Sequence, residues 1–208
     1  MSVFIRDAVR TPRGKARPDG DLAALQPHEL VTGLVDGLEA RGADPRSVEG
    51  GHPAMVAKMY AELGDGCVVH SLNNFCASGL SAIGLAANAI AAGQARDALA
   101  GGVEMMSRVP FMADRADYYT AADLPPLRRY IPVGLAADLL CEDEGVAREA
   151  MDSAAERSQR LAASAEAHPS FNASRIALNG LDRDEAVRPT TIEKLTALPP
   201  AFGEWGRE

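Results

Sequence analysis

The segment that decides the fold is Asn73–Leu80, which reads NNFCASGL. It joins a short apolar run, Cys67–Leu72, to a stretch rich in alanine and glycine that continues over residues 79–92. The first run has the composition of a buried strand, and the second has the length and small side chains of a helix packed closely on a sheet. The segment therefore predicts a strand, a tight polar turn and a helix, with Cys76 in the turn.

Two more runs, Val3–Val9 and Ala98–Val103, have the composition of strands. A strand, a helix and another strand with short joints form a βαβ unit, which implies a mostly parallel sheet. Helical patterns occupy 27–41, where Pro27 suits the first turn, and 53–63.

The character of the chain changes after Val109, where Asp, Tyr, Pro and Arg fill residues 114–130 and predict an exposed excursion. Helical patterns follow at 133–140 and 146–168, and a brief one at 190–198, with an irregular stretch over 171–188.

The chain has 208 residues and a net charge of −8, with no cluster of Lys and Arg, which argues against a nucleic-acid partner. No apolar run approaches the length of a membrane span, and the first residues lack the pattern of a signal peptide. We therefore expect a cytoplasmic protein with no membrane partner. The three cysteines are irregularly spaced, so we expect neither a disulfide framework nor a metal site.

Cys76 stands where a thiol would be most reactive. Ligands bind at the ends of strands in open parallel sheets, and the N–H groups and dipole at a helix start favour the thiolate. Ser78 and Gly79 are small, so a ligand could approach the sulfur closely. The alternative is that Cys76 is a small buried hydrophobe, which position alone leaves equally open. Cys67 and Cys141 are expected to be buried.

Four stretches resemble the N-terminal half of the thiolase family, in the family's order. They are VFIRDAVRTPRGK (3–15), NNFCASG (73–79), GGVEMMS (101–107) and RPTTIEKL (188–195). The resemblance implies an α/β fold: a thiolase-like N-terminal core over 1–112, with a mixed, mostly parallel sheet and helices on its faces. A mainly helical loop subdomain over 113–208 would follow, and the C-terminal thiolase domain would be absent.

The resemblance also implies a function, that of a thiolase-type acyltransferase working through an acyl-cysteine at Cys76. Such an enzyme cleaves 3-ketoacyl-CoA or condenses acetyl-CoA, as in fatty acid degradation and lipid metabolism. Coenzyme A thioesters are substrates, so no cofactor is expected, and a homo-oligomer is expected. Arg188 and Met106 match positions that bind substrate; their alternatives are a solvated surface charge and a core side chain.

The sequence also departs from the family pattern. The loops that carry the family's activating histidine, second cysteine and water-positioning asparagine would follow Glu208, so we expect this chain to be incomplete by itself. Between Val48 and Gly50 a further strand is expected and no residues remain to form it. His52 is interpreted as a loop residue. The alternative function is therefore a catalytically inactive protein that binds acyl-CoA, or an assembly protein that needs a partner.

Overall fold

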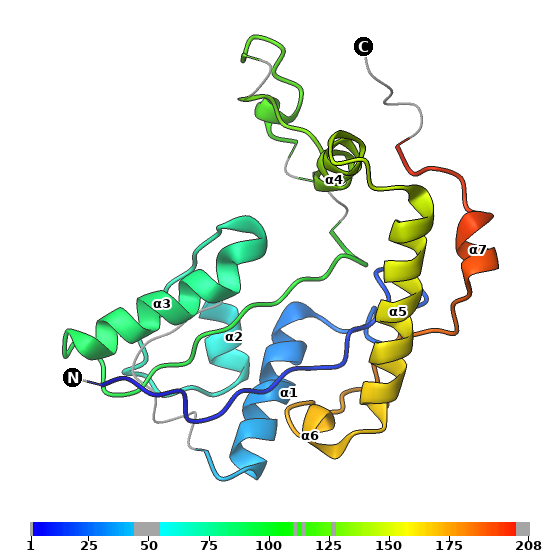
Figure 1. Cartoon of the computed structure of the whole chain (residues 1–208). Helices are drawn as coiled ribbons and strands as arrows, with labels where there is room; N and C mark the ends of the chain where they lie inside the picture. Colours follow the sequence, from blue (N-terminus) through cyan, green and yellow to red (C-terminus); the bar gives the residue numbers. More distant parts are fainter. Residues whose placement is uncertain (1, 44–54, 110–111, 114, 126–127, 203–208) are drawn as a thin grey trace. The chain divides into compact units, whose positions relative to one another are not determined.

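The structure, a computed structural model, describes residues 2–43, 55–109, 112–113, 115–125 and 128–202 (Figure 1). The chain divides into two compact units. The first comprises Met1–Val109 with Pro169–Ala186, and the second comprises Pro110–His168 with Val187–Glu208. The family-based division into 1–112 and 113–208 stays a prediction, because these units are defined by contacts within this chain alone. The interruption at Val48–Gly50 and the loop at His52 lie outside the described residues.

The first unit contains three helices where the sequence predicts them: α1 (Pro27–Ala40), α2 (Met55–Tyr60) and α3 (Ser78–Ala91). It also contains the 3-10 turn η2 (Phe75–Ala77) and the short helix α6 (Pro169–Asn172), which begins before a stretch predicted to be irregular. Helix α1 begins as predicted at Pro27, and the Gln26 N–H donates to Glu29 Oε2 at 2.7 Å, which satisfies one backbone donor near the helix start. The rings of His28 on α1 and Tyr60 on α2 stack with centroids 4.0 Å apart, so these two helices pack together.

A small core holds this unit together. Leu22, Leu30, Met105 and Leu181 are buried in one cluster, with Leu178 packed against it. Two glycines on one face of α1 make the approach possible. A β carbon on Gly33 would lie 2.6 Å from a methyl of Leu178, and one on Gly37 would lie 2.7 Å from the Ile176 side chain. Helix α1 therefore packs directly against residues 176–178, far away in the sequence.

Backbone pairing also joins the start of the chain to this later segment. Arg10 forms an isolated parallel bridge with Arg175; the Arg10 N–H donates to Ser174 O and the Ile176 N–H donates to Arg10 O, both at 2.8 Å. These bonds explain why Pro169–Ala186 belongs to the first unit, although the segments before and after it in the sequence belong to the second.

The three predicted strands are not formed in this structure. Residues 3–9, 67–72 and 98–103 are neither helix nor strand, and the described residues contain only two isolated β-bridges, the second between Leu178 and Leu181. A strand exists only when a neighbour satisfies its N–H and C=O groups, so a suitable composition is not sufficient. The predicted sheet is therefore unconfirmed, although the helices that would cover it are present.

The second unit contains α4 (Val133–Asp143), α5 (Arg148–Glu166), α7 (Ile192–Thr196) and a 3-10 turn η3 (Asp117–Tyr119). The three helices lie within the ranges predicted, apart from an extension of α4 by about a turn. Arg148 of α5 donates to the buried carboxylate of Asp152 at 2.9 Å and to the carbonyl of Leu195 at 2.8 Å. The first bond lies within α5, and the second links α5 to α7, which lie side by side (Figure 1).

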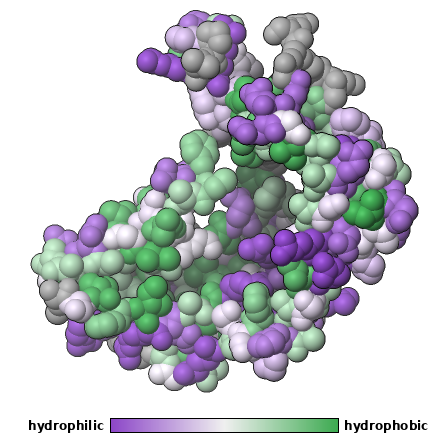
Figure 2. All heavy atoms as spheres, viewed as in Figure 1, coloured by the Kyte–Doolittle hydropathy of each residue, from purple (hydrophilic) through white to green (hydrophobic). Residues whose placement is uncertain are grey.

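Many large apolar side chains remain exposed in the first unit, and Figure 2 shows them at the surface over α3. They include Phe4, Ile5, Val68, Phe75, Leu80, Ile83 and Leu85. None of the helices within the described ranges is both long and apolar enough to cross a membrane.

Candidate active site

Cys76 lies in η2, immediately before the first residues of α3, and its side chain is exposed. This placement confirms that the residue stands in a turn at a helix start. The alternative interpretation, a small buried hydrophobe, is wrong for Cys76. Cys67, by contrast, is buried as expected, and Cys141 is half-buried on α4.

The backbone before Cys76 is unusual, because Phe75 has a φ of +47°. A bulky residue in this left-handed region is a steric outlier that costs about 1–2 kcal/mol. The turn therefore needs local interactions that hold it.

Two polar side chains supply those interactions. Asn73 Oδ1 accepts a hydrogen bond from the Phe75 N–H at 2.9 Å. The Ser78 hydroxyl donates to the Phe75 carbonyl at 2.7 Å and accepts from the Asn74 N–H at 2.8 Å. Both backbone groups of Phe75 are thus bonded to side chains. Farther along α3, Ser81 accepts from the Asn74 side-chain amide at 3.0 Å, a bond that does not involve Phe75.

These positioning contacts were not predicted from the sequence, where Ser78 was singled out only for its small size. The signal that could have revealed them is the composition of the turn. Asn and Ser side chains commonly hydrogen-bond to backbone groups two or three residues away.

Met106 begins the turn that follows the segment 98–103. It is exposed, whereas its neighbour Met105 is buried in the core cluster. Arg108 in the same turn donates to the Ala24 carbonyl at 2.7 Å, which fixes the turn against the opening loop of the unit. The core-residue alternative is therefore wrong for Met106, and its contact with substrate stays a prediction.

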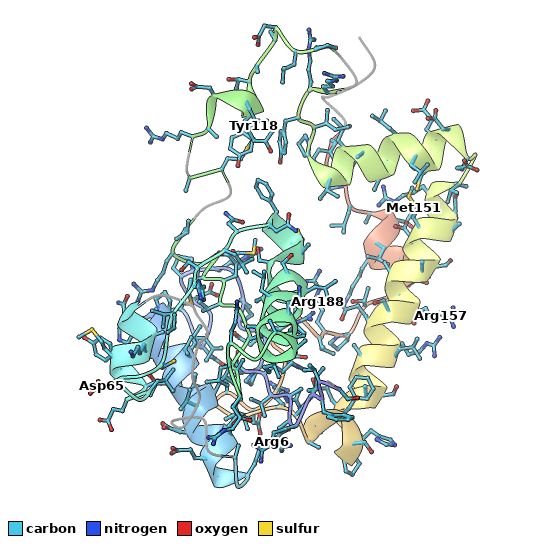
Figure 3. The ribbon with its side chains drawn as sticks, turned by 90° about the vertical axis from the view of Figure 1, so that its left-hand side faces the viewer. Arg6, Asp65, Tyr118, Met151, Arg157 and Arg188 are labelled. Atoms are coloured by element: carbon cyan, nitrogen blue, oxygen red, sulfur yellow. The ribbon has the colours of Figure 1, made fainter. Side chains whose placement is uncertain are left out.

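Arg188 belongs to the second unit, in the segment that leads to α7 (Figure 3). Its side chain is exposed, and its backbone is fixed on both sides. The Arg188 N–H donates to Gln159 Oε1 on α5 at 3.0 Å, and the Thr190 hydroxyl donates to the Arg188 carbonyl at 3.1 Å. The Arg188 side chain is therefore exposed to solvent, while hydrogen bonds fix its backbone. Its role in substrate binding stays a prediction.

The family model described as the N-terminal domain of thiolase matches residues 3–207. This chain belongs to the thiolase family. The match covers the turn at Cys76, Met106 and Arg188 alike, and it confirms the family assigned from the four motifs.

Curated thiolases align with almost the whole chain. The 3-ketoacyl-CoA thiolase of Erwinia tasmaniensis is 32% identical over 225 aligned positions, covering 96% of this chain and 58% of that protein. The beta-ketoadipyl-CoA thiolase of Pseudomonas knackmussii is 35% identical over 246 positions, covering 97% of this chain and 60% of the relative. The 3-ketoacyl-CoA thiolase of Marinobacter nauticus is 31% identical, covering 96% of this chain and 57% of the relative.

Two facts follow from these lengths. The chain spans about three fifths of the length of the thiolases it matches, 57% to 60% in these three. In addition, 96% of 208 residues is about 200, so about 25 of the 225 positions aligned with the Erwinia protein have no residue in this chain. The relatives therefore carry extra residues within the aligned region, and the interruption near Val48–Gly50 stays a prediction.

Proposed function

We propose that this thiolase-family chain provides the nucleophilic half of an acyl-CoA acyltransferase, with Cys76 as the residue that is acylated. The observation that carries the proposal is the exposed Cys76 at the start of α3, inside the family's motif. The relatives are named as thiolases of 3-ketoacyl-CoA and beta-ketoadipyl-CoA, so acyl-CoA thioesters are the proposed substrate class.

The proposed reaction has two steps. In condensation, the Cys76 thiolate attacks the thioester carbon of an acyl-CoA, the bond to coenzyme A breaks and coenzyme A leaves as its thiolate; the enolate carbon of a second acyl-CoA then takes the acyl group and releases the Cys76 thiolate. In cleavage, the thiolate attacks the keto carbon of a 3-ketoacyl-CoA, the bond from that carbon to the α carbon breaks, and the enolate of acetyl-CoA leaves and is protonated; the sulfur of coenzyme A then takes the acyl group and releases Cys76. Backbone N–H groups at the start of α3 would stabilise the oxyanion of the first step.

We assign Met106 and Arg188 to substrate binding as part of the same proposal. An exposed thioether suits contact with an acyl or pantetheine chain, and a guanidinium suits a nucleotide phosphate. Coenzyme A thioesters act as substrates, so the proposal requires no bound cofactor. A cytoplasmic location and a role in fatty acid degradation accompany this assignment.

The second candidate is an acyl-CoA-binding or assembly protein that turns over only with a partner. The observation that favours it is the apolar surface of the first unit, where Phe75, Leu80 and Leu85 are exposed and available to a partner. We also propose that residues 3–9, 67–72 and 98–103 pair as a sheet once further strands are supplied, which the family match and their composition support.

The deciding experiment is intact-mass spectrometry after incubation with acetyl-CoA. Wild type should gain one acetyl group, Cys76→Ser should gain none, and Cys141→Ser should behave as wild type because Cys141 lies on α4, outside the motif. Wild-type protein that stays unmodified while a complete thiolase is acylated would eliminate the first half-reaction for this chain and favour the partner-dependent alternative.

A further inference from the structure

We propose that Ser78 is a positioning residue for the Cys76 thiol, acting through the left-handed backbone of Phe75. This inference deepens the proposed function and rests on it, since it concerns the residue proposed to be acylated. It goes beyond the family assignment, which identifies a cysteine but not what holds it in place.

Phe75 has a strained backbone. Its φ of +47° is tolerated readily by glycine but not by a residue with a β carbon. Burial of the Phe75 side chain does not offset the cost of this backbone strain, because the residue is 68% exposed. The turn must therefore be held through its backbone.

Ser78 contacts both sides of this strained residue. Its hydroxyl accepts from the N–H of Asn74, which precedes Phe75, and donates to the carbonyl of Phe75 itself, at 2.8 and 2.7 Å. The Ser78 backbone N–H reaches the same carbonyl. A single hydroxyl therefore closes the turn across Phe75, and Asn73 adds the bond to the Phe75 N–H.

The backbone of Phe75 in turn affects the direction of the Cys76 side chain. The bonds from the Ser78 hydroxyl and N–H to the Phe75 carbonyl close the 3-10 turn Phe75–Ala77, and the closed turn restricts the ψ of Cys76, which decides where its side chain points relative to the first N–H groups of α3. If Phe75 relaxes to negative φ, its carbonyl leaves Ser78, the turn opens, and the Cys76 side chain is no longer held at the helix start, where backbone donors stabilise a thiolate and the oxyanion. Loss of the Ser78 hydroxyl should therefore slow reactions of Cys76 without removing the cysteine.

The test compares four versions of the 208-residue chain: wild type, Ser78→Ala, Ser78→Thr and Ser81→Ala. Two rates are measured for each version. One is the rate at which iodoacetamide alkylates Cys76, with the modified residue identified by peptide mapping, and the other is the rate at which acetyl-CoA acetylates Cys76. We expect Ser78→Ala to slow both about tenfold, since small misplacements of a reacting group have effects of at least this size. Ser78→Thr keeps the hydroxyl and should restore most of the rate. Ser81→Ala should change it less than about twofold, because Ser81 bonds only to the Asn74 side chain.

A double-mutant cycle separates positioning from a general loss of stability. Glycine adopts positive φ without strain, so Ser78→Ala should cost much less in a Phe75→Gly background than in wild type. If Ser78→Ala fails to fold, judged by circular dichroism, Asn73→Ala provides the second variant, and it should slow alkylation in the same direction.

The outcomes are distinguishable from those of the proposed function. A wild type that is not acetylated rejects the acyltransfer proposal, while the alkylation rates still decide the role of Ser78. An alkylation rate in folded Ser78→Ala that equals or exceeds wild type overturns the positioning role. An equal loss in the wild-type background and in the Phe75→Gly background overturns it as well.

Discussion

At the scale of single residues, Asp184 and Glu185 close the opening loop of the first unit. Asp184 accepts two hydrogen bonds from the Arg10 guanidinium, at 2.7 and 2.9 Å, and Glu185 Oε2 accepts from the N–H groups of Lys15 and Asp21, at 2.9 and 3.1 Å. Two adjacent carboxylates thus bind a loop more than 160 residues earlier in the sequence.

These contacts shift the titration of both groups. Burial raises the pKa of Asp184, but the hydrogen bonds from Arg10 and Arg13 and the nearby charges together lower it below its ordinary value. The Lys15 N–H lowers the pKa of Glu185 against a smaller opposing effect of burial. Because both pKa values are lower in the folded state, the stability that they provide is present above the unfolded values and is lost as the pH falls through the folded ones.

We predict that Asp184→Asn lowers the free energy of unfolding by about 2 kcal/mol at pH 7, the size of a charge-assisted contact. The difference from wild type should shrink as the pH falls below about 4, since protonation then removes the same contact in wild type. Urea unfolding followed by circular dichroism at pH 7 and pH 3 measures both values.

The matched control is Asp182→Asn, which removes an exposed carboxylate on the same segment. It should change the unfolding free energy by less than about 0.5 kcal/mol. A loss for Asp184→Asn that persists unchanged at pH 3 would contradict the electrostatic account.

At the scale of elements, glycines serve different purposes in α1 and α3. Gly37 on α1 faces three side-chain atoms of Ile176 that a β carbon would meet at 2.7 to 2.9 Å. Gly84 on α3 has open space where its β carbon would stand. One glycine permits a tertiary contact, and the other only weakens its helix.

Alanine substitutions should therefore have opposite signs. Gly37→Ala gains about 1 kcal/mol of helix propensity but overpacks Ile176 at a cost of about 1–3 kcal/mol, so net destabilisation by about 1 kcal/mol is expected. Gly84→Ala should stabilise by about 0.5–1 kcal/mol. Midpoints of urea unfolding measure both, and a stabilising Gly37→Ala would show that α1 does not pack on residues 176–178 as described.

At the scale of the whole molecule, several large apolar side chains of α3 are exposed at the surface (Figure 2). Contiguous apolar surface is typical of interaction sites. We expect a homo-oligomer on the family resemblance, and α3 provides two exposed leucines, Leu80 and Leu85, through which copies could associate.

We predict that the 21.9 kDa chain sediments as a species larger than a monomer, and that Leu85→Gln weakens association about tenfold or more by removing one leucine from the interface. Leu161→Gln is the control, because Leu161 is exposed to a similar extent, 50% against 56% for Leu85, but lies on α5 rather than on α3. Analytical ultracentrifugation over a range of concentrations measures both. A monomeric wild type, or an equal effect of the two substitutions, would contradict self-association through α3.

The family, the longer helices and the turn that carries Cys76 could be predicted from the sequence alone, whereas the short helix α6 could not. Helices α1 and α3 form where the pattern predicts them because their hydrogen bonds and amphipathic spacing are local. The motif likewise marked Cys76 as the residue at a helix start.

The remaining features could be found only in the folded structure, because they depend on partners far away in the sequence or on geometry that a residue type does not encode. Residues 3–9, 67–72 and 98–103 form no β-ladder in this structure, and a ladder needs a neighbouring strand that composition alone does not supply. The binding of the opening loop by Asp184, the fit of Ile176 against Gly37 and the left-handed Phe75 held by Ser78 all arise from the way in which the folded backbone brings these groups together.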